Sequence, residues 1–197
     1  LPSMDGVTSL ARRVPHGVVG VISPFNFPFL LSSRATLPAL ACGNAVVLKP
    51  DLRTPFSGGV LLALLLQAAG LPQGVLQMLP GEAEAGEALV TDPDVAMISF
   101  TGSTAVGRRV GELAGKHLKK VALELGGKNA LIVRADADLD LAVCNAAWAS
   151  YLHQGQICMS AGRHLVHKDL LESYSRLIAE KARALPVGNP HTEPVAL

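Results

Sequence analysis

The fold is decided by a stretch near the N-terminus, residues 17–50, which reads GVVGVISPFNFPFLLSSRATLPALACGNAVVLKP. Residues 17–22 form a continuous apolar run, the pattern of a strand that is buried on both faces. The spacing predicts a helix over 28–41, which ends before the Gly-Asn pair at 43–44 because both residue types tolerate the left-handed conformation. A second apolar run over 45–48 then completes a strand–helix–strand unit, which is typical of a parallel sheet.

The same alternation continues along the chain. Further helices are predicted over 55–69, 82–90, 104–114, 139–153 and 169–185, and further strands over 75–79, 96–100, 120–125, 130–133 and 164–167. The repeated strand–helix cycles before residue 115 predict an α/β fold with a doubly wound parallel sheet. Such sheets bind their ligands beyond the carboxyl ends of the strands, so we expect the polar segments after the strands to line one cleft.

The composition excludes several classes of protein. Seventeen basic and sixteen acidic residues leave a net charge of +1, and aromatic residues make up 4% of the chain. The charges are scattered and stacking side chains are few, so neither a nucleic-acid footprint nor a patch for an anionic membrane is indicated. The longest apolar stretch, 60–70, is interrupted by Gln67 and is too short to span a bilayer.

The cysteines and the two ends of the chain bear on its cellular context. Cys42, Cys144 and Cys158 cannot all pair within one molecule, and no secretory signal segment opens the sequence. Free thiols in a reducing compartment are the simpler interpretation, which predicts a cytoplasmic location. The chain begins at Leu1 without a methionine and stops at Leu197, which predicts a fragment of a longer protein.

Four short motifs carry the chemistry. They are SPFNFP at 23–28, FTGSTAVGR at 100–108, LELGGK at 123–128 and GQIC at 155–158. In this order they resemble the aldehyde dehydrogenase superfamily, and the resemblance covers essentially the whole chain. The Gly-x-Gly-x-x-Gly fingerprint is absent, which argues against an ordinary dehydrogenase.

The resemblance implies three catalytic residues. Cys158 is the nucleophile, since a thiolate attacks an aldehyde carbon and is also a leaving group when the resulting thioester hydrolyses. Asn26, held between two aromatic residues just past a buried strand, supplies an oxyanion-hole amide together with the Cys158 N–H. Glu124, at a strand end where we expect partial desolvation, activates the hydrolytic water. Cys42 and Cys144, within apolar helical runs, are expected to be buried and inert.

Each of these roles has a plainer alternative. Cys158 could be a buried, inert cysteine, Asn26 could simply close a turn, and Glu124 could be a surface carboxylate at a strand end. A different enzyme class is also open, because Cys158 with His153 or His164 could form a cysteine hydrolase site. That alternative leaves the glycine-rich run after residue 101 without a use.

The resemblance also places the cofactor, NAD or NADP. Gly102, Ser103 and Gly107 follow a strand and open a helix, where the backbone can approach a diphosphate and the helix dipole favours negative charge. Leu52 stands where many NAD-preferring members have glutamate, so a 2′-phosphate is not repelled and NADP is expected to be tolerated. The other expected contacts are Lys49 at the adenosine ribose, Ile22, Ser23, Phe25 and Leu125.

The segment 51–55, Asp-Leu-Arg-Thr-Pro, points to a substrate class. It resembles the benzaldehyde and vanillin dehydrogenase branch, which implies an aromatic aldehyde. The expected reaction is oxidation of the aldehyde to the carboxylic acid through a thiohemiacetal and a thioester on Cys158. Phe25 replaces a commoner tryptophan, and Ala105 replaces a commoner glutamate.

Two domains are expected from the resemblance. Residues 1–125 are a Rossmann-like dinucleotide-binding domain, with 1–12 as a candidate remnant of oligomerisation strands, and residues 126–197 begin a truncated catalytic domain. The parent enzyme is expected to be a homodimer or tetramer without a metal, a nucleic-acid partner or a membrane partner. The alternative is a catalytically inactive nucleotide-binding fragment of such an enzyme.

Overall fold

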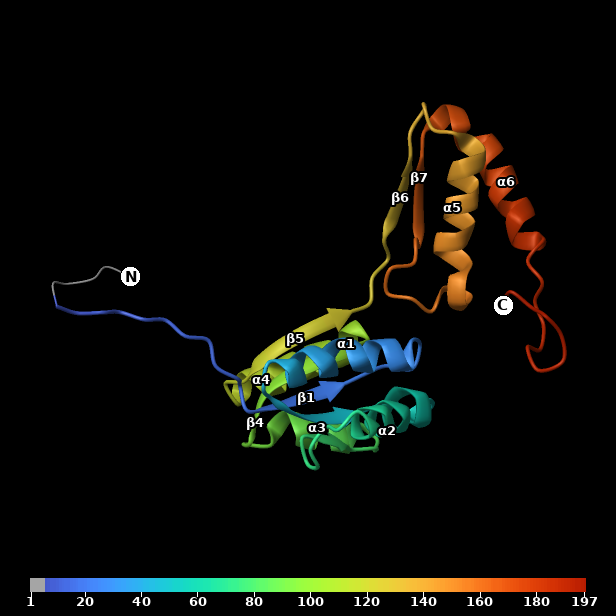
Figure 1. Ribbon diagram of the computed structural model, residues 1–197. Helices are drawn as coiled ribbons and strands as arrows, with labels where there is room; N and C mark the ends of the chain where they lie inside the picture. Colours follow the sequence, from blue (N-terminus) through green and yellow to red (C-terminus); the bar gives the residue numbers. More distant parts are fainter. Residues whose placement is uncertain (1–5) are drawn as a thin grey trace. The chain divides into compact units, whose positions relative to one another are not determined.

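The computed structural model describes residues 6–197 (Figure 1). The described chain divides after Glu124 into two compact units, of which the second is Leu125–Leu197. The first part of the expected remnant at 1–12 lies outside the described residues, and residues 7–16 form neither helix nor strand. No helix in the described part of the chain is long and apolar enough to cross a membrane.

A five-stranded sheet forms the centre of the first unit. Its strands are β1 (Val18–Ile22), β2 (Ala45–Lys49), β3 (Leu76–Met78), β4 (Val95–Gly102) and β5 (Lys120–Leu125), in the order β3-β2-β1-β4-β5. β1 runs parallel to both β2 and β4, and β2 runs parallel to β3. The direction of strand addition therefore reverses after β3, when the chain crosses to the other side of β1, which is typical of a doubly wound sheet. The predicted α/β fold is confirmed.

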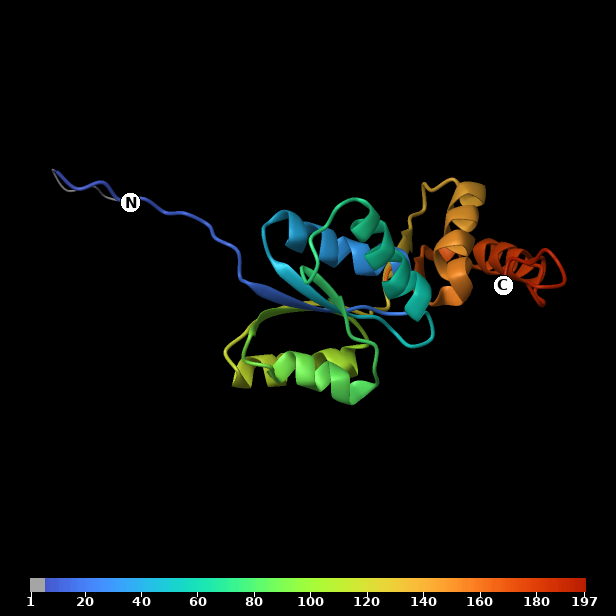
Figure 2. The same ribbon diagram turned by 60° about the horizontal axis from the view of Figure 1, so that its bottom comes forward.

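Helices cover both faces of this sheet. They are α1 (Pro28–Ala41), α2 (Leu61–Ala68), α3 (Ala83–Thr91) and α4 (Thr104–Lys116). Figure 2 shows α1 and α2 on one face and α3 and α4 on the other. Val21, Leu48 and Ile98 are at most 1% exposed, in keeping with the apolar run of β1. Gly20 belongs to this packing, since a Cβ there would lie 2.8 Å from Ile98 Cδ1.

The segment predicted as one helix over 55–69 consists of two elements. A π-helix, Phe56–Val60, precedes α2, so the prediction of a single regular helix is wrong here. Glycines let this turn pack closely on its neighbours: a Cβ on Gly59 would lie 2.6 Å from Met78 Sδ and 2.9 Å from Pro50 Cγ. Such turns often lie at functional sites. The contacts that favour the π-helix come from elsewhere in the chain, so local periodicity does not reveal it.

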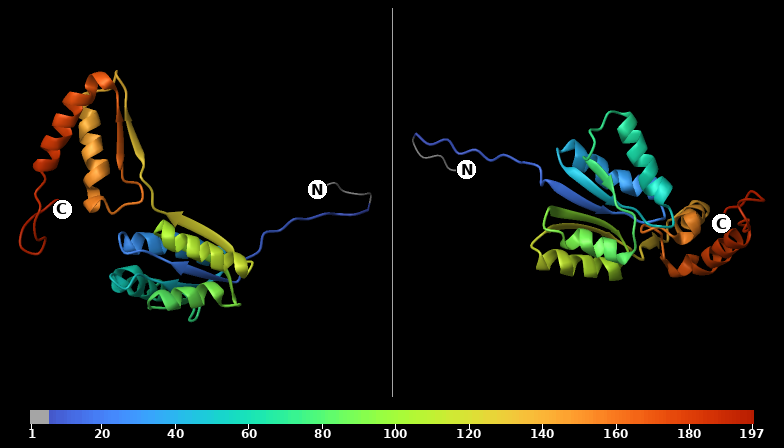
Figure 3. Two further views of the ribbon diagram at one scale, coloured as in Figure 1. Left: turned by 180° about the vertical axis from the view of Figure 1, so that it is seen from behind. Right: turned by 90° about the horizontal axis from the view of Figure 1, so that it is seen from below.

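The second unit packs two helices beside a two-stranded parallel sheet. β6 (Ala130–Val133) pairs with β7 (Arg163–Val166), and α5 (Leu139–Tyr151) contacts α6 (Leu171–Arg183). Figure 3 shows the two helices side by side next to the strand pair. The buried core of this unit consists of Val133, Val143, Ala146 and Tyr174.

Two predicted helix boundaries in this unit shift. The helix predicted over 139–153 ends earlier, because His153 and Gln154 adopt left-handed backbone conformations with φ of 53° and 55°. A short 3₁₀ turn, Leu152–Gly155, takes that place. The helix predicted over 169–185 begins two residues later, after a second 3₁₀ turn.

Candidate active site

The segment that carries Asn26 is tied to the sheet at its start. Ser23, the first residue after β1, donates its N–H to the Lys49 carbonyl at 3.1 Å, and its hydroxyl lies 2.7 Å from Ser32 Oγ. Ser32 donates its own proton to the Gly58 carbonyl at 2.6 Å, so Ser23 is the donor to Ser32. Both serines are buried. This chain of bonds joins β1, α1 and the π-helix just before the half-buried Asn26.

Phe25, next to Asn26, is covered by an arginine. The guanidinium carbon of Arg53 lies 3.6 Å from the centroid of the Phe25 ring. Asp51 holds that guanidinium through two hydrogen bonds, of 2.9 Å from Nε and 2.8 Å from Nη2. The hydrogen bond from Arg53 lowers the pKa of Asp51. Sequence reasoning missed this contact, and the signal for it is an Asp and an Arg two residues apart directly after a strand end.

A cavity of about 390 Å³ lies between α3 and α4. Ile22 and Lys49, both predicted cofactor contacts, line it together with Phe100 and apolar side chains of the two helices. Arg109 Nε and Glu87 Oε1, 2.9 Å apart, form an ion pair among the lining residues. The structure therefore brings two of the predicted residues to one apolar cavity that also contains charged groups.

The glycine-rich run after β4 begins α4. Ser103 is the N-cap of this helix, and its Oγ accepts the Val106 N–H at 3.3 Å. Gly102 packs on an aromatic ring, since a Cβ there would lie 2.6 Å from Phe100 Cζ, and Gly107 is buried. The predicted phosphate contact Ser103 thus already serves its own helix. The helix N-terminus itself remains the feature that suits an anion.

Glu124 and Leu125 end β5, which is an edge strand of the sheet. Leu125 is half-buried, whereas Glu124 is exposed. The expected partial desolvation of Glu124 is therefore wrong. β5 lies at the edge of the sheet and most of its side chains are exposed, so neither face of this strand is well covered.

Cys158 lies in the second unit, on a loop without helix or strand that precedes β7, as the sequence predicted. Its side chain is exposed, while that of its neighbour Ile157 is buried. Asn129, just before β6, donates its amide to the carbonyls of Cys158 at 3.0 Å and Ser160 at 3.2 Å. One side chain thus holds the backbone on both sides of Met159. Sequence reasoning missed Asn129, and no local signal marks it, because its partners are 29 and 31 residues away.

The two other cysteines differ from expectation. Cys42 follows the end of α1, and Cys144 lies on α5 next to the buried Val143. Both are exposed, so the prediction of buried thiols is wrong. An α-helix turns by about 100° per residue, which takes Cys144 away from the face that Val143 and Ala146 bury.

His164, on β7, has a partner at each ring nitrogen. Its Nε2 lies 2.9 Å from Ser150 Oγ, and its Nδ1 lies 2.8 Å from the Tyr174 hydroxyl. A base for a cysteine nucleophile needs a ring nitrogen that faces the thiol. This arrangement therefore disfavours a cysteine hydrolase that uses His164.

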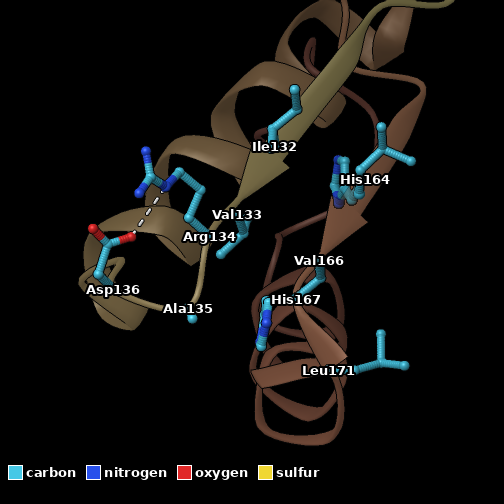
Figure 4. Close-up of a pocket in the computed structure, with 10 residues that line it drawn as sticks. Ile132, Val133, Arg134, Ala135, Asp136, His164, Val166, His167 and Leu171 are labelled. Carbon is cyan, nitrogen blue, oxygen red and sulfur yellow. Dashed lines mark ion pairs between the residues drawn. The ribbon is translucent and has the colours of Figure 1, made fainter. Parts of the chain in front are cut away.

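A hollow of about 880 Å³ lies along β6 and β7 (Figure 4). Figure 4 shows Arg134 turned towards Asp136, and this ion pair measures 3.2 Å. Of the residues considered as site candidates, only His164 lines this hollow, and none of the predicted aldehyde dehydrogenase catalytic or cofactor residues does. Within residues 6–197, no group of three or more His, Cys, Asp or Glu side chains is arranged to hold a metal ion.

Comparison with known proteins identifies the family. The model of the aldehyde dehydrogenase family matches residues 1–197. This chain belongs to the aldehyde dehydrogenase family. Vanillin dehydrogenase of Amycolatopsis sp. is 62% identical over 197 residues, which are 100% of this chain and 40% of that protein. Benzaldehyde dehydrogenase (NAD⁺) of Pseudomonas putida is 55% identical over 195 residues, which are 99% of this chain and 40% of that protein.

A solved structure agrees with these relatives. The crystal structure of an NAD-dependent benzaldehyde dehydrogenase from Corynebacterium glutamicum has a TM-score of 0.87 and 48% identity, over 93% of this chain and 40% of that one. The aldehyde dehydrogenase chain described here thus spans 40% of the length of these relatives. The resemblance drawn from the four motifs and from the 51–55 segment is confirmed.

Proposed function

We propose that the protein oxidises an aldehyde to the carboxylic acid with NAD or NADP, and that the aldehyde is aromatic. Family membership supports the reaction class, and the names of the vanillin and benzaldehyde dehydrogenases support the aromatic substrate. The structural observation that carries the proposal is the Cys158 loop. It presents an exposed thiol on a backbone that Asn129 anchors.

Residues of the first unit are proposed to hold the cofactor. The cavity between α3 and α4 combines apolar walls with Lys49, which is a chemical match for an adenine ring and its ribose hydroxyls. Gly102, Gly107 and the N-terminus of α4 suit the diphosphate. The bound nicotinamide supplies the hydride acceptor. The remaining proposed contacts are Ile22, Ser23, Phe25, Ser103 and Leu125.

The proposed mechanism uses three side chains of this chain. The Cys158 thiolate adds to the aldehyde carbon, and the Asn26 amide and the Cys158 N–H donate hydrogen bonds to the oxyanion of the thiohemiacetal. Loss of hydride from that carbon leaves a thioester on Cys158. Glu124 then takes a proton from water, whose attack on the thioester releases the acid and regenerates the thiolate.

Use of either cofactor is proposed from the residues after β2. Leu52 brings no negative charge to this edge of the sheet, and the carboxylate of Asp51 is already paired with Arg53. A 2′-phosphate therefore meets no unpaired anion in this segment, and without such repulsion NAD and NADP are poorly discriminated.

The domain and assembly assignments are part of the same proposal. We take residues 1–125 as the dinucleotide-binding domain and residues 126–197 as the start of the catalytic domain. The division of the chain into compact units after Glu124 supports this boundary. A homodimer or tetramer is proposed from the family alone.

Calorimetric titration of the chain with NAD and, separately, NADP tests the cofactor proposal. We expect saturable binding of both and about tenfold weaker binding by Lys49→Ala, since a hydrogen bond from a charged group is lost. Lys116→Ala removes an exposed lysine at the end of α4 and serves as the matched control, with unchanged binding expected. Absence of binding of either cofactor to the folded, unsubstituted chain would contradict the assignment.

A further inference from the structure

A hydrogen-bonded relay in the second unit leads from its core to the Cys158 loop. Tyr174 on α6 is 3% exposed, and its hydroxyl lies 2.8 Å from His164 Nδ1. His164 Nε2 lies 2.9 Å from Ser150 Oγ, and Ser150 Oγ donates to the Ala161 carbonyl at 3.1 Å. The relay thereby connects α6 to β7, β7 to α5, and α5 to the loop.

The donors in this relay follow from its last bond. The single proton of Ser150 points to the Ala161 carbonyl, so Ser150 accepts from His164, and Nε2 carries the ring proton. With the ring proton on Nε2, Nδ1 is the acceptor, and the Tyr174 hydroxyl donates to it. Each bond has one donor and one acceptor, and the edge of the tyrosine ring packs on the imidazole with centroids 5.7 Å apart.

A serine beside a histidine could also indicate a hydrolytic nucleophile. The direction of the protons argues against that function here. A nucleophilic serine gives its proton to the imidazole, whereas Ser150 gives its proton to a backbone carbonyl. The relay therefore fixes the position of a backbone segment.

The segment that the relay fixes is the C-terminal end of the Cys158 loop. Ala161 is held twice, because its N–H also donates to the Ala149 carbonyl at 2.9 Å. Asn129 holds the carbonyls of Cys158 and Ser160 from another direction. The nucleophile thus lies on a short loop whose backbone is anchored at Cys158 itself and just after it, at Ser160 and Ala161.

We propose that Ser150, His164 and Tyr174 form a clamp that orients the Cys158 backbone, with His164 as a positioning residue for the nucleophile. This inference rests on the proposed function, since it assigns the clamp a role in aldehyde oxidation. The orientation matters because the Cys158 N–H is a proposed oxyanion donor, and such donors act only in a fixed geometry.

Hydrogen exchange measured by mass spectrometry tests the clamp without any need for activity. Tyr174→Phe removes one hydroxyl from one end of the relay, and Ser150→Ala removes the other end. Both are expected to speed exchange of the Ser160 and Ala161 amides about tenfold, the effect of losing one buried hydrogen bond. Ser175→Ala, an exposed serine next to Tyr174 on α6, is the matched control and should leave these amides unchanged.

Steady-state kinetics with benzaldehyde and NAD test the positioning role. Tyr174→Phe and His164→Leu are expected to lower kcat about tenfold while the KM for NAD stays within twofold. His164→Gln keeps an N–H for Ser150 and should recover most of kcat. The rate at which iodoacetamide alkylates Cys158 should change less than twofold in these variants, because this reaction needs no oxyanion donor. The alkylation rates of Cys42 and Cys144 serve as internal references.

The outcomes separate the clamp from the proposed function. Unchanged exchange in both Tyr174→Phe and Ser150→Ala would overturn the clamp. Faster exchange with unaltered kcat would show that the relay stabilises the loop without positioning the nucleophile, and would overturn the role of His164. Turnover that is absent in the unsubstituted enzyme would refute the proposed function, and the positioning role with it, while exchange still decides whether the clamp exists.

Discussion

The carboxyl edge of the sheet and the Cys158 loop are held in place by different means. At the sheet edge, the parallel register of β1 and β2 places Ile22 opposite Lys49, and the backbone of Ser23 continues that ladder. At the loop, the side chains of Asn129 and Ser150 hold backbone carbonyls. A ladder distributes the constraint over many bonds, so single substitutions release the loop more easily than the edge.

The largest effect is expected at the loop itself. Cys158→Ala removes the proposed nucleophile, and aldehyde oxidation should fall by more than about 10³-fold, as removal of a covalent nucleophile does in other enzymes. NADH formation from benzaldehyde measures this. Cys144→Ala, which deletes another exposed thiol of the same unit, is the control and should keep full activity. Turnover retained by Cys158→Ala would contradict the proposed mechanism.

Asn26→Ala tests the proposed oxyanion-hole amide at the carboxyl edge of the sheet. Loss of one oxyanion-hole donor should lower kcat by about 10² to 10³-fold. The melting temperature, measured in parallel, separates a loss of catalysis from a loss of folding, and Ser23 ties the start of this segment to the sheet. Asn145→Ala, at an exposed position on α5, is the control, and an equal loss of kcat in both variants would argue against a specific role.

Two glycine-to-alanine substitutions, one in the π-helix and one on α4, test the close packing of the π-helix. Gly59→Ala places a methyl group 2.6 Å from Met78 Sδ and 2.9 Å from Pro50 Cγ, so it should lower the free energy of unfolding by about 1–3 kcal/mol. Gly115→Ala on α4 meets no atom within 4 Å and should be neutral or slightly stabilising. Urea unfolding midpoints measure both, and equal midpoints would show that the π-helix tolerates a side chain.

The smallest effect is expected at the Asp51–Arg53 pair. Arg53 lowers the pKa of Asp51 below its ordinary value of 3.8, so the pair stabilises the folded state fully above that pH. Its contribution is lost as the pH falls through the lowered value. The stability difference between the unsubstituted chain and Asp51→Asn should therefore be present at pH 7 and shrink below pH 3.8, as measured by urea unfolding.

A control separates this pair from general charge effects. Asp94→Asn changes an exposed aspartate elsewhere in the first unit and should not reproduce the pH dependence. The Arg53 side chain is 65% exposed, so added salt should weaken the Asp51 effect. A difference that grows towards low pH would have the wrong sign and would contradict the assignment.

Most of the fold was predictable because periodicity is a local property. Neighbouring residues are enough to predict the apolar run of β1, the helix 28–41 with its Gly-Asn end, and the strand that follows. The observed bounds of these elements differ from the predicted ones by at most one residue. The motif order also identified the family. The exceptions involve non-local packing, as at the π-helix, where Met78 and Pro50 leave no room for a Cβ on Gly59.

The sequence alone determined the strand–helix pattern, the family and the position of Cys158 in a turn, since each depends on residue types at short spacing. Only the tertiary structure decided that Glu124 lies exposed on an edge strand, that Cys42 and Cys144 are exposed, and that Asn129 and the Ser150–His164–Tyr174 relay hold the loop. Exposure and side-chain hydrogen bonds are set by residues far apart in the chain. No local pattern encodes that proximity.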